Sequence, residues 1–520
     1  MLAPQNPRPQ AAQPPGPDEE RADMATKVLI VGAGPVGLTL AAELHRFGLE
    51  VRIIDKQSTP SPQSRALFLW SRTLEQLDRL YLSGEMVALG RKIRAVNVMA
   101  GHSRIGHIGF GGTDTPYPFA LLLPQAQTER LLIEHLAARG VFVERGTELT
   151  GFEDSPLGVT VQLRRETGES GQITTDWLVG ADGAGSFVRR ALGLSSTGAA
   201  LQSDWLIADG TLEGADLPAD ELLSFWHEDG FLGLFPLDGG QYRVIAEIPH
   251  GEGAQAITPD LAGMQSRLET RGPGGLRLVA PSWFSSFRIH ERNMAEYRLG
   301  HVFLAGDAAH VFNPVGAQGL NMGIQDAVNL AWKLALVAAG TANAEALLES
   351  YTAERHVAAA QVVADTGRAE AVALLRSPTL RLARNLLGGL FFGLSPLRKS
   401  VAESLAQLST GYGQSPLNGP AAAPVPGPQP GERMPPRANE PPIGARGPRF
   451  ALFADPSRPV LALHQEFAAM LEPTLRPPPK SGGVWLVRPD GYVAACGADD
   501  ELTRLADYLR RFQTLGELVG

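Results

Sequence analysis

The chain has a single cysteine, Cys496, among its 520 residues. One thiol cannot form an intrachain disulfide, a CxxC redox centre or a zinc site built from several thiolates. This scarcity fits a reducing compartment, so we expect a cytoplasmic protein. Cys496 follows an apolar run that is typical of a strand, and we expect it to be a small buried residue.

Positive charge is also in short supply. Lysine and arginine number 46 against 55 acidic residues, which gives a formal net charge of −9. Nucleic-acid binders are normally basic, so we expect no nucleic-acid partner. Residues 1–23 contain six prolines and no apolar segment of a signal peptide, so they are predicted to be a disordered tail.

Long apolar runs are absent. A membrane-spanning helix needs about 20 consecutive apolar residues, and no stretch approaches that length, so stable membrane insertion is not expected. The longest uncharged run of this kind covers residues 385–397. We expect a buried helix there with a turn at Ser395–Pro396, and a surface that meets a partner or lipid is the alternative.

Hydrophobic residues make up 44% and charged residues 19%, which is typical of a globular protein of several domains. The clearest boundary is the segment 411–448, which has 11 prolines in 38 residues. Such a composition predicts an extended, poorly folded linker. Beyond it, alternating strand and helix patterns predict a small α/β unit.

The most informative local pattern starts at the apolar run 27–31, which reads as a buried parallel strand. Gly32, Gly34 and Gly37 follow in a GxGxxG turn that opens a helix, and Asp55 ends the next strand. The glycines allow a tight turn, close approach of a pyrophosphate and close helix packing, while the acid suits a ribose. This pattern predicts a dinucleotide site but does not distinguish NAD from FAD.

Two later motifs bear on that choice. Residues 180–190, GADGAGSFVRR, place Asp182 and Gly183 in a turn between a strand and a helix. Residues 306–310, GDAAH, are followed at 314–321 by PVGAQGLN, which leads into a helix. Glycines let the backbone lie against a flat ring, and a helix N-terminus favours negative charge such as that of a reduced flavin.

With these motifs the chain resembles the FAD-dependent aromatic hydroxylases, or class A flavoprotein monooxygenases, and among them the phenol, polyketide and rifampicin hydroxylases. The resemblance implies a Rossmann-like FAD-binding domain interleaved with an antiparallel-sheet substrate domain, and a small C-terminal thioredoxin-like α/β domain. Together with composition it divides the chain into a tail (1–23), an FAD-binding domain with trailing helices (24–94, 124–204 and 290–410), a substrate-binding sheet domain (95–123 and 205–289), a linker (411–448) and a thioredoxin-like domain without CxxC (449–520).

The resemblance also implies residue roles. Asp307 would hold the ribityl chain, the Leu320–Asn321 pair would meet the isoalloxazine ring, and Arg65 (or Arg72, nearby) would neutralise the pyrophosphate. The FAD-binding residues implied in this way are Gly32, Gly34, Gly37, Asp55, Lys56, Arg65, Gln125, Leu149, Asp182, Gly183, Gly306, Asp307, Pro314, Gly316, Gly319, Leu320 and Asn321.

The implied reaction is hydroxylation of a phenolic or polyketide-like aromatic small molecule with NAD(P)H and O2, through a flavin C4a-hydroperoxide. The cofactor supplies this chemistry, so no protein nucleophile and no metal site are expected. His227 and the Pro314 carbonyl are the catalytic candidates. The substrate-pocket candidates are Trp226, His227, Phe235 and Tyr242. Successive strand residues alternate in direction, so about half of such candidates must point away from a pocket.

Alternatives stay open at this point. The same fold could host a Baeyer–Villiger-type oxygenase or another flavin oxidoreductase, or a non-catalytic flavoprotein. A W-x-W-x-I-P motif, typical of flavin halogenases, is absent. The sequence identifies neither the substrate nor the position of hydroxylation, and it leaves open NADPH or NADH, monomer or homodimer, and the role of the C-terminal domain.

Overall fold

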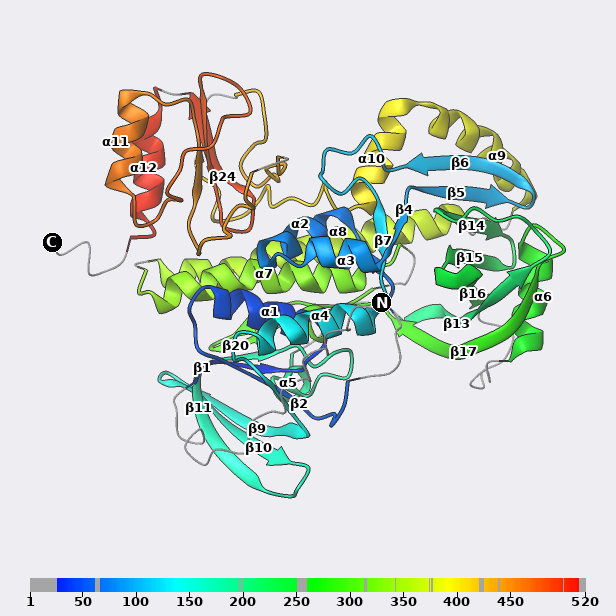
Figure 1. The fold of residues 1–520 in the computed structure, drawn as a ribbon, viewed down its shortest axis with the longest axis horizontal. Coiled ribbons are helices and arrows are strands. Elements are labelled where there is room, and N and C mark those ends of the chain that lie inside the picture. The colour runs from blue at the N-terminus through cyan, green and yellow to red at the C-terminus, as the bar shows by residue number, and fades with distance from the viewer. Residues whose placement is uncertain are drawn as a thin grey trace, which may run out of the picture.

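The computed structural model of the protein describes residues 26–513, apart from 61–65, 195, 198–199, 250–259, 313–315, 342, 374, 376, 420–424, 438–439 and 499. The predicted tail, 1–23, therefore lies outside the described residues. The expected mixed α/β class is confirmed, with two large sheets and several smaller ones (Figure 1).

The first large sheet is built around parallel strands whose central residues are fully buried. Branched apolar side chains fill strands that are covered on both faces, which explains the uninterrupted apolar run of the first strand. In spatial order its strands are β19 (Arg298–Leu299), β20 (Val302–Leu304), β11 (Ser170–Gly180), β1 (Thr26–Val31), β2 (Val51–Asp55) and β8 (Val143–Arg145), with β10 (Gly158–Arg165) and β9 (Thr147–Ser155) continuing antiparallel from β11.

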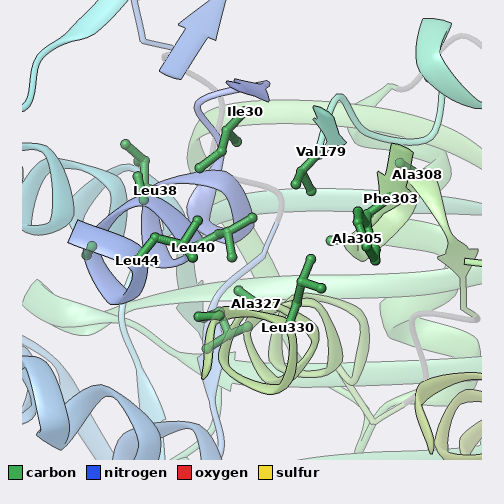
Figure 2. Close-up of a cluster of buried hydrophobic side chains, with 14 of the residues drawn as sticks. Ile30, Leu38, Leu40, Leu44, Val179, Phe303, Ala305, Ala308, Ala327 and Leu330 are labelled. Carbon is green, nitrogen blue, oxygen red and sulfur yellow. The ribbon is translucent and has the colours of Figure 1, made fainter. Parts of the chain in front are cut away.

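Two helices pack against each other over this sheet, α1 (Pro35–Arg46) and the long α7 (Gly319–Ala338). Figure 2 shows side chains of both helices and of the sheet pointing toward one another in one buried cluster. The neighbouring helices are α4 (Gln125–Ala137), α5 (Phe187–Ala191) and α8 (Ala344–Ala373). The start of α1 and the start of α7 are thereby held in one rigid core.

The second large sheet has seven strands, of which only the β14–β5 pair is parallel. Helix α6 (Leu261–Arg271) covers one of its faces. Its strands, in spatial order, are β17 (Arg277–His290), β13 (Ala200–Glu213), β16 (Gln241–Pro249), β15 (Gly230–Pro236), β14 (Glu221–His227), β5 (Ala95–Ala100) and β6 (Ser103–Gly109).

Short elements join the two large sheets. Helix α2, the 3-10 turn η2 and α3 lie next to a small sheet of β3, β7 and β4, and a second small sheet pairs β12, β18 and β21. Their bounds are β3 (Phe68–Leu69), α2 (Ser71–Leu77), η2 (Asp78–Leu80), α3 (Ser83–Leu89), β4 (Arg91–Ile93), β7 (Ala120–Leu122), β12 (Ser196–Thr197), η3 (Asp238–Gly240), β18 (Arg292–Met294), η4 (Gly306–Ala308) and β21 (His310–Val311).

The C-terminal unit consists of an antiparallel three-stranded sheet and two helices, and it lies beside one end of α7 (Figure 1). Trp332 of α7 belongs to the same apolar cluster as Phe450 and Leu486, so the unit shares core with the rest of the chain. Its elements are β22 (Ala451–Phe453), α11 (Arg458–Glu466), β23 (Gly483–Val487), β24 (Val493–Ala498) and α12 (Leu502–Arg510).

The proline-rich segment 411–448 differs from the poorly folded linker that its composition predicts. It has no helix or named strand among its described residues, but Tyr412, Leu417 and Met434 are buried. Arg433 donates to Glu75 at 2.9 Å. Extended backbone with anchoring side chains is thus packed between the C-terminal unit and α2, because polyproline-like conformation does not prevent side-chain burial.

The apolar run 385–397 also differs from its expected burial. It falls within α9 (Pro378–Gly393) and the start of α10 (Ser395–Leu405). Phe392 packs against Gly106 of β6, but Leu386 is 65% exposed and Leu394 is 58% exposed. The helix therefore buries one face and leaves an apolar face outward. In the described part of the chain, no helix has the length and hydropathy required to cross a membrane.

Candidate functional site

The turn between β1 and α1 has the geometry that its three glycines predict. Gly32 has φ +106°, and a Cβ there would lie 2.4 Å from the carbonyl oxygen of Ala181. A Cβ on Gly37 would lie 2.0 Å from the Gly32 carbonyl oxygen. Gly34, in contrast, has no atom within 4 Å of a built Cβ, so space is left open at the start of α1. That space suits a phosphate held by free N–H groups.

Asp55 lies directly beside this turn. Its Oδ2 accepts a hydrogen bond from the Ala33 N–H at 2.8 Å, and its Oδ1 accepts one from Gln57 at 2.8 Å. Each carboxylate oxygen keeps a further lone pair for a ribose hydroxyl. Lys56 is exposed next to it. Asp55 therefore both closes the glycine turn and faces the space that the turn leaves open.

The turn after β11 carries an acid with an unused oxygen. Asp182 Oδ2 accepts from the N–H groups of Phe187 at 2.7 Å and Val188 at 3.2 Å, which caps the short helix α5. Its Oδ1 is buried and has no hydrogen-bond partner among the described residues. Gly183 follows with φ +78°. A buried acceptor without a partner is costly, so this oxygen marks a place where a ligand donor fits.

The loop after β20 brings Asp307 to the start of α7. Gly306 has φ +62°, and a Cβ there would lie 2.9 Å from Val36 of α1. The Asp307 carboxylate is solvent-accessible, and its Oδ1 lies 4.0 Å from the Cβ position of Gly319. Surrounding protein raises the pKa of Asp307 through desolvation, which His310 partly offsets.

A residue that the sequence reasoning missed holds this loop. Asp326 of α7 is fully buried, and its Oδ2 accepts from the Gly306 N–H at 2.9 Å and contacts His310 Nε2 at 2.6 Å. Its Oδ1 accepts from Arg355 Nε at 2.6 Å. Burial alone would raise the pKa of Asp326, but His310 and Arg355 outweigh it and hold the pKa low. Asp326 is the one acidic residue in the sequence of α7, and this was the available signal.

The start of α7 is shaped by Asn321. Its Oδ1 accepts from the Trp70 N–H at 2.8 Å, and its Nδ2 donates to the carbonyls of Phe68 and Ala317, each at 3.0 Å. The Asn321 side chain is fully buried and uses its polar atoms in these hydrogen bonds. A ligand at this helix start would therefore bind to backbone groups of the first turn. Ala317 has φ +52°, a left-handed conformation that is strained without glycine.

The structure gives local contacts for some of the other FAD-binding residues that the resemblance implies and leaves two of them undescribed. Gly316 has φ +83° and accepts from Trp70 Nε1 at 2.9 Å, and Leu320 is half-buried beside it. Gln125 begins α4 and donates to Glu129 at 2.8 Å, and Leu149 is buried in β9. Arg65 and Pro314 lie outside the described residues.

Arg72, the alternative to Arg65 for neutralising a pyrophosphate, is buried and directed elsewhere. Its Nη1 donates to Glu75 at 3.0 Å and its Nη2 donates to the Asp490 carbonyl at 2.9 Å. The guanidinium therefore joins α2 to the C-terminal unit. These contacts argue against Arg72 as the pyrophosphate arginine, and the role of Arg65 stays a prediction.

The four substrate-pocket candidates divide between the two faces of the second sheet. Trp226 and Phe235 belong to an aromatic cluster with Phe68 and Trp70. The Phe68 ring meets Phe235 edge-on at 5.4 Å and stacks on Trp70 at 5.6 Å. Because Trp70 also bonds to Gly316, this aromatic cluster borders the start of α7.

His227 and Tyr242 lie on the opposite face. Tyr242 packs with the cluster beneath α6, and His227 shares the β14 face of Phe225, which belongs to that cluster. The His227 Nδ1 accepts from the Asp229 N–H at 3.2 Å at the end of the β14–β15 hairpin. The structure therefore places these two side chains on the other face of the sheet from the aromatic cluster.

The glycine turn yields a matched pair of variants. Gly34→Val should leave the unfolding free energy of the apoprotein nearly unchanged, because its Cβ meets open space, but should abolish detectable FAD binding. Gly37→Val should destabilise the apoprotein by more than about 2 kcal/mol, since its Cβ overlaps a carbonyl oxygen. Urea unfolding and FAD fluorescence titration measure both effects. Equal FAD binding by Gly34→Val and wild type would contradict this assignment.

Comparisons with known proteins agree with this geometry. The family model described as an FAD-binding domain matches residues 25–366. The chain is 37% identical to the 6-methylpretetramide 4-monooxygenase of Streptomyces rimosus, over 94% of each protein. It is 33% identical to the rifampicin monooxygenase of Streptomyces venezuelae, over 74% of this chain and 79% of the relative.

Solved structures are similar over nearly the whole chain. An anhydrotetracycline hydroxylase from Streptomyces rimosus aligns with a TM-score of 0.75 at 30% identity, covering 94% of this chain and 99% of that one. An aromatic hydroxylase of angucycline biosynthesis aligns with a TM-score of 0.75 at 27% identity, with the same coverage. The similarity extends through the C-terminal unit as well as the two large sheets.

Proposed function

We propose, because the chain belongs to the family of FAD-dependent aromatic monooxygenases, that its substrate is a polycyclic aromatic polyketide. The protein is an FAD-dependent aromatic hydroxylase. The observation that carries the substrate class is the end-to-end similarity to the 6-methylpretetramide 4-monooxygenase, which covers 94% of both chains. A relative that acts on pentachlorophenol covers only 65% of this chain, so a single-ring phenol is the second candidate.

FAD, with NAD(P)H as co-substrate, supplies the electron transfer and the activation of O2. We assign the pyrophosphate to the N–H groups at Gly34 and the adenosine ribose to Asp55. Asp182, through its Oδ1 without a described partner, and Asp307 would bind polar groups of the cofactor from the turns after β11 and β20. The first turn of α7 would offer its N–H groups and positive dipole end to the ring and would thereby favour negative charge there.

The aromatic cluster of Phe68, Trp70, Trp226 and Phe235 forms the wall that we assign to the substrate. Flat aromatic rings pack well on edge-to-face and stacked aromatic side chains, which also exclude water from the reacting position. A multi-ring substrate would use more of this wall than a single phenol. The position of hydroxylation then follows from how far the ring system reaches along the cluster toward Gly316.

The test is substrate-stimulated NAD(P)H oxidation by the FAD-loaded enzyme. A panel of polycyclic polyketide aromatics and single-ring phenols should give stimulation by the polycyclic compounds, with a product that gains one oxygen atom by mass spectrometry. Product NMR should show a hydroxyl group on an intact ring. Stimulation by single-ring phenols alone would replace the polyketide proposal, and an inserted ring oxygen would replace hydroxylation.

The two faces of the second sheet predict opposite mutational results. Phe235→Ala should raise KM for the aromatic substrate about 10-fold or more, because it removes an aromatic contact from the proposed wall. His227→Ala should leave the pH dependence of kcat/KM unchanged, because its side chain lies on the other face. Steady-state kinetics across pH check both variants. A lost ionisation in His227→Ala would restore its role as the base for a phenol.

The remaining assignments follow from the family and the composition. In this proposal the chain keeps the division into FAD-binding, substrate-sheet and C-terminal parts. The C-terminal unit is of the thioredoxin-like type but has no dithiol, because its one cysteine, Cys496, is buried with a pKa raised to about 11 by desolvation. A cytoplasmic monomer or homodimer fits this single thiol and the use of NAD(P)H.

A further inference from the structure

A cavity of about 160 Å³ lies between α2 and η2, the proline-rich segment and the C-terminal unit. Met434, Ile443 and Phe453 contribute apolar walls, and four arginines and four acidic residues contribute charge. None of its lining residues belongs to the FAD site or the aromatic cluster described above. The cavity therefore requires its own explanation.

Three of these arginines have acidic partners. Arg72 pairs with Glu75 at 3.0 Å, Arg476 pairs with Glu472 at 2.7 Å, and Arg437 lies 3.8 Å from Glu440. Their positive charges are compensated within the protein. Such pairing is what burial of a guanidinium normally requires.

Arg79 differs from them. It is 3% exposed, and within the described ranges no carboxylate oxygen comes within 4 Å of its guanidinium. Its Nη1 donates to the Pro489 carbonyl, its Nε contacts the Gln76 carbonyl at 3.4 Å, and its Nη2 has no described partner. Burial lowers the pKa of Arg79 to about 10, and the carboxylate of Glu43 only partly offsets this effect.

A desolvated guanidinium with a free donor is a strong receptor for an oxyanion. Its planar fork matches the two oxygens of a carboxylate or the oxygens of a phosphate, and charge-assisted bonds of this kind are the strongest hydrogen bonds in proteins. A cavity of this size accommodates a single small molecule, since a 150 Å³ cavity can hold benzene. The apolar walls permit a small non-polar body beside the anionic group.

We propose that this cavity is a binding site for one small oxyanion, a carboxylate or a phosphate, with Arg79 as its counter-ion. The ligand would accept a hydrogen bond from the Arg79 Nη2, which has no described partner, at the junction of α2, the proline-rich segment and the C-terminal unit. Its binding would stabilise the folded protein in proportion to ligand concentration. The site is independent of the proposed hydroxylation, because no lining residue is assigned to FAD or substrate.

Titration calorimetry on the FAD-loaded enzyme, with chloride used to hold ionic strength constant, tests the proposal with inorganic phosphate and with benzoate as probes. Saturable binding of either one, with a matching rise in Tm, is expected. Phosphate binding alone would indicate a phosphate ligand, and benzoate binding alone would indicate a carboxylate with an apolar body. The flavin site is saturated with FAD beforehand, so that neither probe can bind at the pyrophosphate position and add to the measured heat.

Variants identify the site. Arg79→Gln should weaken binding by about 10-fold or more, and Arg79→Lys, which keeps the charge but not the planar fork, should weaken binding less. Ile443→Phe should also weaken binding, because it fills the cavity without altering a charge. Arg368→Gln, which removes an exposed arginine of α8, is the matched control and should bind as wild type. Absence of saturable binding for both probes, or wild-type binding by Arg79→Gln and Ile443→Phe, overturns the proposal.

Discussion

Asp326→Asn is expected to lower the free energy of unfolding by about 3–5 kcal/mol and to weaken FAD binding by about 10- to 100-fold. The buried carboxylate compensates Arg355 and contacts His310, so its neutralisation leaves buried charge without a partner. It also holds the Gly306 N–H at 2.9 Å, and thereby the position of Asp307. Denaturant unfolding of the apoprotein and FAD fluorescence titration measure the two effects separately.

The neighbouring acid serves as control. Asp307→Asn should weaken FAD binding while changing apoprotein stability by less than about 1 kcal/mol, because Asp307 is solvent-accessible and forms no ion pair among the described residues. Asp326 acts on the cofactor through the loop, so it is a positioning residue. If Asp326→Asn kept wild-type stability and lost only FAD affinity, the anchoring role would be wrong.

Glu354→Gln is expected to cost a similar 3–5 kcal/mol of stability, since Glu354 is the centre of a buried ionic network. It accepts from both Nη atoms of Arg488, at 2.5 Å and 3.0 Å, and from Lys333 at 2.8 Å. Arg488 and Lys333 hold the pKa of Glu354 far below its ordinary value despite burial, so the carboxylate is ionised at neutral pH. The variant would leave Lys333 buried beside a neutral amide.

The same helix offers the control for this variant. Glu345 of α8 pairs with Arg298 at 2.7 Å, but its side chain is 68% exposed. Glu345→Gln should therefore cost less than about 1 kcal/mol, because solvent screens an exposed pair. Calorimetric unfolding of the two variants in parallel gives the comparison. Equal losses for Glu345→Gln and Glu354→Gln would show that burial does not determine the value of these pairs.

The parts of the site that sequence could predict are those set by local chain geometry. Gly32 is required by its positive φ and Gly37 by the close approach of the Gly32 carbonyl, whereas Gly34 leaves the space in which a phosphate fits. Asp55 follows at the end of β2, because one regular helix and one regular strand bring the chain back beside the turn. Local periodicity therefore located the glycine turn, the following helix and the mixed α/β class without knowledge of the remaining contacts.

The parts that sequence missed depend on contacts between distant segments. Asp326 and Gly306 are 20 residues apart, and Glu354 and Arg488 are 134 residues apart. Strand alternation indicated that about half of the pocket candidates must face away, but it could not show that His227 and Tyr242 lie on the face that α6 covers. Composition likewise could not reveal the side-chain anchors of the segment 411–448.

Two consecutive residues of α8 face opposite partners. Glu354 binds Arg488 of the C-terminal unit, and Arg355 binds Asp326, which holds the loop after β20. One turn of α8 thus pairs with charges of both the C-terminal unit and α7, so separation of either contact would leave a buried ion of α8 without its partner. We expect the apoprotein to melt in a single cooperative transition, and the backbone amides of this turn to exchange with solvent hydrogen only through global unfolding.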